Sequence, residues 1–440
     1  MLKLRNLVLI GLALGAALAL SAANTSAQSG PSPTAGARLT GGLLNPKGVK
    51  IGPDGMLYVA EAGTSGDITP AGSHASKSGF TGRISRIDPI TGARTTVADK
   101  LPSSALAGIE GPADVAFIGG QLYYLQAHGG EFFGFPDNPT GVYRVNKDGT
   151  VALVADITTF NVDHPIGDST NKSRQDIEAG GEPAAMTVRD GTFLVAEESA
   201  LGVANAREDQ VLKITTRGAI TRLAEFRGTP VLTGITTGDS GPLYVTALGP
   251  PPFLASDGAV YRVDYPTGSI TRVASGFSAM DDVKAGPGGQ LYALSFGDFS
   301  PDGPGFVGSG KMFKLDAAAG TLTPVVTGFT APTKFTLAGD TAYVSNNGAS
   351  DRVGVGEIWK IDNVSSLKAL PASEPTRATA PSAPTAQSVI AAPNAGTGGT
   401  ADRGAWFSAV LIMGVAGVAL IVAGARDARV GWPSNKRSWR

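Results

Sequence analysis

Short runs of alternating hydrophobic and polar residues extend along most of the chain, and turns rich in glycine separate them. The run Val260-Tyr261-Arg262-Val263 shows this alternation, which is typical of a β-strand with one covered face. Pairs such as Asp54-Gly55 and Asp190-Gly191 are typical of tight turns in β-hairpins. The pattern therefore predicts an all-β domain built from short antiparallel strands.

Six similar units make up this domain. Each unit has a short strand, a turn, a strand of the type Leu-Tyr-Val, and a third strand that follows a loop of variable length. The first pair of strands falls in residues 45–61 and the last in 331–346, and five units add a fourth strand. Six units of four antiparallel strands predict a six-bladed β-propeller over residues 37–365.

The sixth unit lacks a fourth strand of its own, because it stops after residues 357–361. The run 38–43, which precedes the first unit, has the pattern of the missing strand. We therefore expect this N-terminal strand to complete the last blade, which removes a free sheet edge and joins the two ends of the domain.

Both ends of the chain carry segments of a different kind. Residues 1–27 combine two basic residues, an apolar run and small residues, which is typical of a signal peptide; a retained membrane anchor is the alternative. Residues 366–404 are rich in Pro, Ala, Ser and Thr and are typical of an extended stalk. Residues 405–425 contain no charge and are long enough to form one C-terminal transmembrane helix. A buried core helix is the alternative for that segment.

The distribution of charge gives an orientation to this arrangement. Five basic residues in the tail 426–440 predict a cytoplasmic C-terminus and a propeller outside the cytoplasm, in the cell membrane. The tail holds five of the 36 basic and one of the 37 acidic residues, and the signal peptide holds two basic ones, so the exported part has a net charge near −7. Such a surface disfavours a nucleic-acid partner, and the absence of Cys excludes thiol nucleophiles and disulfides.

The repeat order resembles that of a known family. The runs GPADVAF and VYRVNKDGTVALVADITTF, the recurring LYV and the closing AYVSNNG are similar to the ScyD/ScyE family of NHL-like repeat propellers. The resemblance covers about residues 38–363 and implies an exported six-bladed propeller. It implies no catalytic residues.

Polar residues at two aligned positions in the blades are the candidates for ligand binding. One position ends the second strand and the other begins the first strand, and both are predicted to border the upper mouth of the channel. The predicted binding residues are Glu61, Asp114, Gln126, Glu197, Asp282, Lys334 and Asn346. The carboxylates among them, Glu61, Asp114, Glu197 and Asp282, could bind a hard cation such as Ca²⁺. Alternatively, these side chains are hydrogen-bonded plugs, and Lys334 pairs with Asp114 or Asp282.

The three histidines, His74, His128 and His164, fall in long loops on the same predicted face and have no diagnostic metal-ligand spacing. We therefore expect exposed bystanders rather than a metal or acid–base cluster.

Two functions from different classes fit these features. The long one-sided loops and the predicted tether favour a membrane-tethered binding or scaffold module for an extracellular small molecule or protein. No GxSxG elbow occurs, and the near P-loop at 305–312 lacks its hydroxyl residue, so the sequence favours a binding module over an enzyme. The alternative is a metal-dependent hydrolase or lactonase that uses the carboxylates of the channel mouth.

Overall fold

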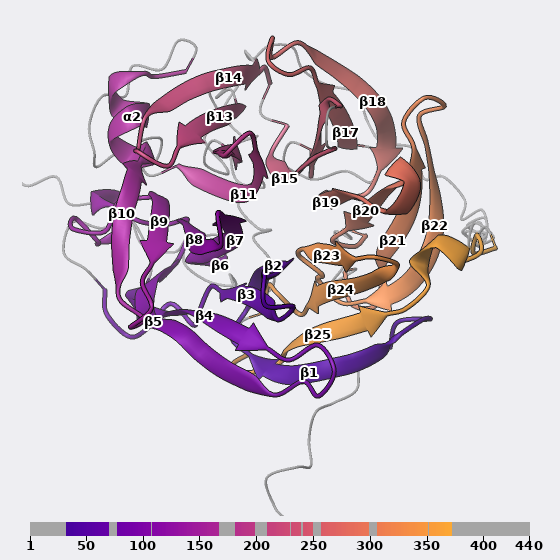
Figure 1. Cartoon of the computed structure of the whole chain (residues 1–440), viewed down its shortest axis with the longest axis horizontal. Helices are drawn as coiled ribbons and strands as arrows, with labels where there is room; N and C mark the ends of the chain where they lie inside the picture. The colour runs from indigo at the N-terminus through magenta and orange to yellow at the C-terminus, as the bar shows by residue number, and fades with distance from the viewer. Residues whose placement is uncertain are drawn as a thin grey trace, which may run out of the picture.

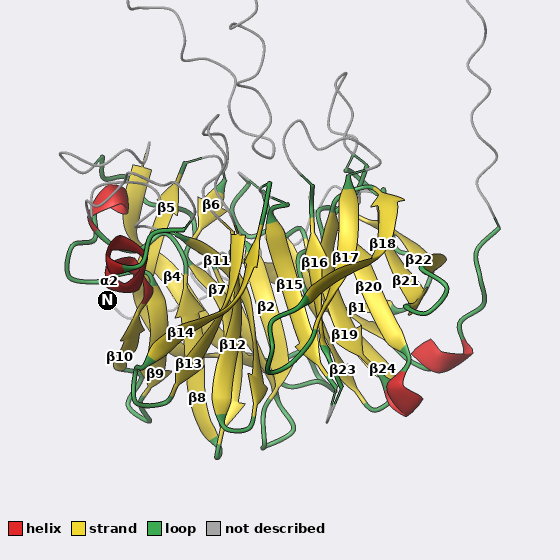
Figure 2. Ribbon diagram, turned by 90° about the horizontal axis from the view of Figure 1, so that it is seen from above, coloured by secondary structure: helices red, strands yellow, loops and turns green. Residues whose placement is uncertain are grey.

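The computed structural model describes residues 32–69, 77–106, 108–166, 181–198, 209–228, 230–238, 241–249, 257–298, 306–350 and 352–371. Their strands form six antiparallel sheets around one axis, which confirms the all-β six-bladed propeller (Figure 1). In Figure 2 the strands run between the two faces of the ring. The propeller is thus a rigid frame whose innermost strands meet at the axis.

Five blades follow the chain order from the innermost strand outward. The first contains β2 (Pro46–Ile51), β3 (Leu57–Glu61), β4 (Lys77–Ile87) and β5 (Arg94–Ala105). The second contains β7 (Pro112–Ile118), β8 (Gln121–Gln126), β9 (Gly141–Val145) and β10 (Val151–Asp156). The third contains β11 (Glu182–Arg189), β12 (Thr192–Glu198), β13 (Asp209–Thr215) and β14 (Ile220–Phe226). The fourth contains β15 (Leu232–Thr237), β16 (Leu243–Ala247), β17 (Gly258–Val263) and β18 (Ile270–Phe277), and the fifth β19 (Met280–Ala285), β20 (Leu291–Ser295), β21 (Gly310–Asp316) and β22 (Thr321–Phe329).

The sixth blade closes the ring as the sequence predicts. It contains β23 (Phe335–Ala338), β24 (Thr341–Asn346) and β25 (Gly356–Ile361) from the end of the domain, and β1 (Ala37–Leu43) from its beginning. The strands β1 and β25 are antiparallel, with Arg38 opposite Trp359 and Leu43 opposite Gly356. The predicted pairing of residues 38–43 with 357–361 is therefore confirmed.

Two local features depart from the simple repeat. A short fifth strand, β6 (Ile109–Glu110), extends the sheet of the first blade beyond the predicted four. The stretch after β10, which the repeat pattern leaves as a loop, begins with the helix α2 (Ile157–Asp163). The Asp156 side chain accepts a hydrogen bond from the Thr159 backbone N–H and caps this helix. Three short 3-10 helices, Glu131–Phe133, Pro287–Gly289 and Val364–Ser366, complete the described elements.

Six clusters of the hydrophobic core lie between the blades, one at each interface between neighbours. Between the sixth and first blades, Leu43 from β1 packs with Leu57, Val59 and Ile358. The strand that closes the ring therefore also fills the last interface, so that pairing and packing depend on each other.

The predicted signal peptide, most of the stalk, the predicted transmembrane helix and the basic tail lie outside the described residues. Within the described ranges, no helix is both long and apolar enough to cross a membrane.

We expect Leu43→Ala to lower the free energy of unfolding by about 2–4 kcal/mol, because the fully buried side chain leaves a cavity in the closing interface. Urea denaturation followed by circular dichroism measures the loss. Arg38→Ala is the control on the same strand: its ion pair with Glu357 is exposed, so we expect a change below about 1 kcal/mol. Equal losses in the two variants would contradict this account of closure.

Candidate functional site

The innermost strands β2, β7, β11, β15, β19 and β23 surround the axis of the propeller (Figure 1). Charged side chains gather there from β2, β6, β7 and β19 and from the residue before β23. We call the set the axial charge cluster; its members are Lys47, Lys50, Glu110, Asp114, Asp281, Asp282, Lys284 and Lys334. Six of these residues are buried. Glu110 and Lys50 have the most accessible side chains of the ion pairs in this set, at 31% and 19%.

Asp114 and Asp282 join neighbouring blades through the backbone. The Asp114 carboxylate accepts hydrogen bonds from the N–H of Val115 (2.8 Å) and, in the next blade, from the N–H of Met186 (2.9 Å). Asp282 repeats this arrangement three blades later and accepts from the N–H of Phe335 at 3.0 Å. Two of the predicted binding residues thus hold the inner strands together.

Small residues make room for these two aspartates. At the aligned position of the preceding blade, Gly48 lies against Asp114 and Gly234 lies against Asp282. An added Cβ atom at Gly234 would come within 2.7 Å of both the Cα and the Oδ1 of Asp282. The packing of the two carboxylates therefore explains why glycine precedes each aspartate at this position around the ring.

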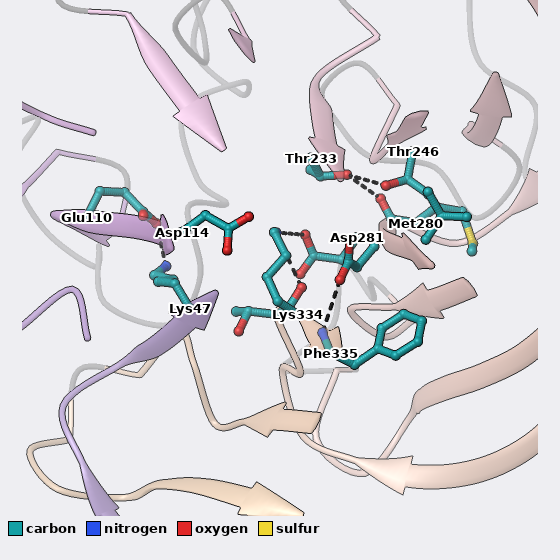
Figure 3. A network of polar contacts seen from close by, with 12 residues as sticks. Lys47, Glu110, Asp114, Thr233, Thr246, Met280, Asp281, Lys334 and Phe335 are labelled. Atoms are coloured by element: carbon teal, nitrogen blue, oxygen red, sulfur yellow. Dashed lines mark hydrogen bonds and ion pairs between the residues drawn. The ribbon is translucent and has the colours of Figure 1, made fainter. Parts of the chain in front are cut away.

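Four lysines neutralise the carboxylates of the axial charge cluster. The shorter contacts, both 2.5 Å, join Lys47 Nζ to Glu110 Oε1 and Lys284 Nζ to Asp282 Oδ1. The longer ones join Lys334 Nζ to Asp281 Oδ1 at 3.2 Å and Lys50 Nζ to Asp114 Oδ2 at 3.5 Å. Figure 3 shows Lys334 directed toward Asp281 and Lys47 toward Glu110. The structure therefore corrects the predicted partner of Lys334, which is Asp281 and neither Asp114 nor Asp282.

Burial shifts the pKa values of two members of this cluster, Asp281 and Lys284, toward neutrality. It raises the pKa of Asp281 to about 6, although the Lys334 ammonium opposes the shift. Burial also lowers the pKa of Lys284 to about 8, against the effect of Asp282. For Lys334, burial lowers the pKa, but Asp281, Asp282 and Asp114 outweigh it and the net shift is upward. Perturbed groups of both signs in one place mark a candidate functional site.

The predicted residues at the end of the second strand have different partners, which belong to their own blades, to the loops before them or to a neighbouring blade. Glu61 accepts the Leu44 N–H at 2.6 Å and pairs with Arg83 at 3.2 Å. Asn346 accepts the Thr330 N–H at 2.9 Å. Their equivalent in the second blade, Gln126, donates to the carbonyl groups of Pro102 and Ala127. These side chains hold the loop before the blade or the neighbouring strands, as the plug alternative proposed.

Glu197 is the end-of-strand carboxylate of the third blade. It accepts hydrogen bonds from the side-chain amides of Asn161 on α2 (2.7 Å) and Gln210 on β13 (2.8 Å). Burial raises its pKa to about 7, although these two amides and the charge of Arg222 lower it. Glu197 therefore connects α2 to the third blade through a carboxyl group that titrates near neutral pH.

The donor set does not fit a resident Ca²⁺. Among the described residues, no three His, Asp or Glu side chains lie close enough together to hold a metal ion. The oxygens of Asp114 and Asp282 already accept backbone N–H groups and lysine ammoniums, and Glu61 and Glu197 are engaged in separate blades. Calcium prefers six to eight oxygen ligands, which these separated and already bonded carboxylates do not supply together.

The aligned positions in the sequence did not identify five members of the axial charge cluster: Lys47, Lys50, Glu110, Asp281 and Lys284. Asp281 and Lys47 stand one residue before the aligned position that supplied Asp114 and Asp282. The same alignment, read along the whole inner strand, would have found them.

The histidines do not share one environment. His128 is buried, which overturns the expectation of an exposed bystander. His164 is exposed at the end of α2 and stacks on Phe160. His74 lies outside the described residues.

Comparisons with known proteins give a fold and no family. No protein-family model matches the chain, and no curated protein matches it, so the ScyD/ScyE resemblance is not confirmed. Solved structures similar to it include a PQQ-bound aldose sugar dehydrogenase from Streptomyces coelicolor, at 14% identity over 76% of this chain and 99% of that one, with a TM-score of 0.49. Regucalcin, a calcium-binding protein from Agrobacterium tumefaciens, is 13% identical over 74% of this chain and 94% of that one, with a TM-score of 0.47. A gluconolactonase from Xanthomonas campestris is 13% identical over 76% of this chain and 94% of that one, with a TM-score of 0.45. The propeller assignment rests on the sheet topology.

We expect Glu197→Gln to stabilise the protein increasingly as the pH rises. A carboxyl group whose pKa is raised from 4.5 to about 7 on folding disfavours the folded state once it ionises. The cost begins near pH 4.5, grows up to about pH 7 and then stays constant. Between pH 5 and pH 8 the difference in unfolding free energy, variant minus wild type, should rise by about 2–3 kcal/mol. Urea denaturation at the two pH values measures it, and a pH-independent difference would contradict the assignment.

Proposed function

We propose that this chain is a membrane-tethered, extracytoplasmic propeller that binds a small ligand at the axial charge cluster. The observation that supports it is the four ammonium–carboxylate pairs that the inner strands gather around one axis. Buried ion pairs contribute little net stability, and well-packed apolar residues often replace them without loss. A propeller needs no such charges to fold, so their presence favours recognition of a ligand.

The chemistry of the cluster suggests the kind of ligand. Its ammonium groups can bind an anionic group, and its carboxylates can accept hydrogen bonds from hydroxyl groups. A small polyhydroxy acid offers both. Glu110 and Lys50 are the members through which such a ligand reaches the cluster first, because their side chains are the most accessible of the pairs.

D-gluconate is a suitable probe, and isothermal titration calorimetry on the full chain in detergent measures its binding. We expect the double change Asp281→Asn and Lys334→Met, which leaves no unpaired charge, to weaken binding about tenfold or more, a loss of at least about 1.4 kcal/mol. Lys360→Met is the matched control, because Lys360 forms an exposed pair with Asp362 far along the outer part of the sixth blade. Unaltered affinity in the double variant would exclude the axial site.

The hydrolase alternative is tested with the corresponding lactone. Similar structures include a gluconolactonase and the calcium-binding protein regucalcin, which suggests D-glucono-δ-lactone as the substrate to try. Acid release from the lactone is followed with Ca²⁺ and with a chelator. Turnover above the spontaneous rate that depends on Ca²⁺ would favour the lactonase over the binding module.

The tether has its own test. With residues 28–404 outside and 426–440 inside, protease added to intact cells should release the propeller by cutting between residues 370 and 400, where Pro, Ala and Ser residues offer little to pack. Immunoblotting of the medium and the cells detects the released domain. Full-length protein that resists protease on intact cells, but not on lysed cells, would reverse the orientation.

A further inference from the structure

A hydrogen-bonded set of three side chains lies outside the axial charge cluster. His128 Nδ1 lies 2.9 Å from Ser104 Oγ, and His128 Nε2 lies 2.6 Å from Glu182 Oε1. Ser104 belongs to β5 of the first blade, His128 follows β8 of the second, and Glu182 begins β11 of the third. All three residues are buried, so the fold brings together a hydroxyl, an imidazole and a carboxylate from three blades.

The backbone of His128 has an unusual conformation, which is a second observation beside the hydrogen bonds. His128 has a φ of +52°, in the left-handed region that non-glycine residues rarely adopt. The equivalent position, two residues after the second strand, is glycine in the first, fourth and fifth blades, with φ of +93° at Gly63, +95° at Gly249 and +143° at Gly297. The second blade thus accepts a strained histidine where the repeat uses glycine. Such outliers persist where the surroundings fix them and are common at functional sites.

Hydrogen-bond chemistry determines the protonation of the imidazole. An ionised Glu182 carboxylate can only accept, so in the neutral imidazole Nε2 carries the proton. Nδ1 then offers a lone pair, and the Ser104 hydroxyl donates to it. This is the state in which a histidine can take the proton of a serine, while a carboxylate orients the ring.

Aromatic residues form the apolar side of this set. The His128 ring stacks on Phe133, with 4.0 Å between the ring centroids, and Phe133 packs with Phe132, Phe135 and Leu106. The stacking fixes the plane of the imidazole, and the neighbouring rings favour a small apolar group beside Ser104 rather than a charged one.

We propose that Ser104, His128 and Glu182 form an acyl-transfer site for small, uncharged carboxylic esters. Ser104 Oγ bonds to the carbonyl carbon while its proton moves to Nδ1 of His128. The bond from that carbon to the alcohol oxygen then breaks, and the proton passes to the departing alcohol. Water repeats these steps on the acyl-serine, so that a carboxylic acid is released and Ser104 regains its proton. Glu182 holds the imidazole and balances its charge throughout. The site needs no metal and does not depend on ligand binding at the axis.

The reactivity of Ser104 is tested on the full chain with diisopropyl fluorophosphate, a small neutral reagent suited to a buried serine. Peptide mass spectrometry should find the adduct at Ser104 in folded protein. Ser103→Ala is the matched control: the neighbouring buried hydroxyl accepts the Ser65 N–H and does not contact the histidine, so its loss should leave labelling unchanged.

The decisive variant is His128→Gly, which places at this position the residue that four other blades carry. It relieves the left-handed strain and should keep the fold, while labelling of Ser104 slows about 100-fold because the general base is lost. Glu182→Gln is a second variant that preserves shape and should also slow labelling, and p-nitrophenyl acetate hydrolysis should fall in parallel. No adduct at Ser104 in the folded wild type, or equal labelling rates in folded His128→Gly, would overturn the proposal.

Discussion

The pairing of β1 with β25 is the contact on which the rest of the structure depends. It joins residues from the two ends of the domain, as the Arg38–Glu357 ion pair with its sequence separation of 319 illustrates. Without it the sixth blade would present an open edge, and the interface with the first blade would lose Leu43. Closure fixes the angle between every pair of neighbouring blades, so the inner strands stay at constant positions around the axis.

That constancy allows single side chains to cross from blade to blade. A carboxylate at Asp114 or Asp282 reaches a backbone N–H of the next blade only because the inner strands cannot separate. The two aspartates stand three blades apart, and glycine precedes each of them in the ring, so the axis has an approximate two-fold repeat of its own. Neutralising these carboxylates inside a protein requires nearby cations, which is why lysines from several blades converge there.

The architecture could be predicted from the sequence because it is periodic. Alternation, turn residues and six repeated units predicted the blades, and the missing fourth strand of the sixth unit located the closure.

The site could be predicted only in part, because alignment of repeats finds equivalent positions but not the direction of their side chains. Asp114 and Asp282 do border the axis. Glu61 and Glu197, at the other aligned position, instead contact the loop before the blade and α2. Lys47 and Asp281 were missed because only one residue of each inner strand was compared. The strand β6 and the helix α2 lie in segments that interrupt the repeat, so the periodic pattern does not predict them.

Departures from the repeat carry more functional information in this protein than the repeat itself. Stability alone would favour glycine at the left-handed position that His128 shares with Gly63, Gly249 and Gly297, since glycine adopts that backbone without steric cost. His128 accepts the strain and gains two polar partners from other blades, in a region where burial makes every unsatisfied polar atom costly. The same reasoning applies at the axis, where hydrophobic inner strands would pack without the cost of burying ion pairs such as Lys284–Asp282 and Lys334–Asp281. At both sites the chain keeps a local arrangement that lowers stability, through backbone strain or buried charge, inside an otherwise regular ring. Such departures from the stabilising pattern are expected at functional sites.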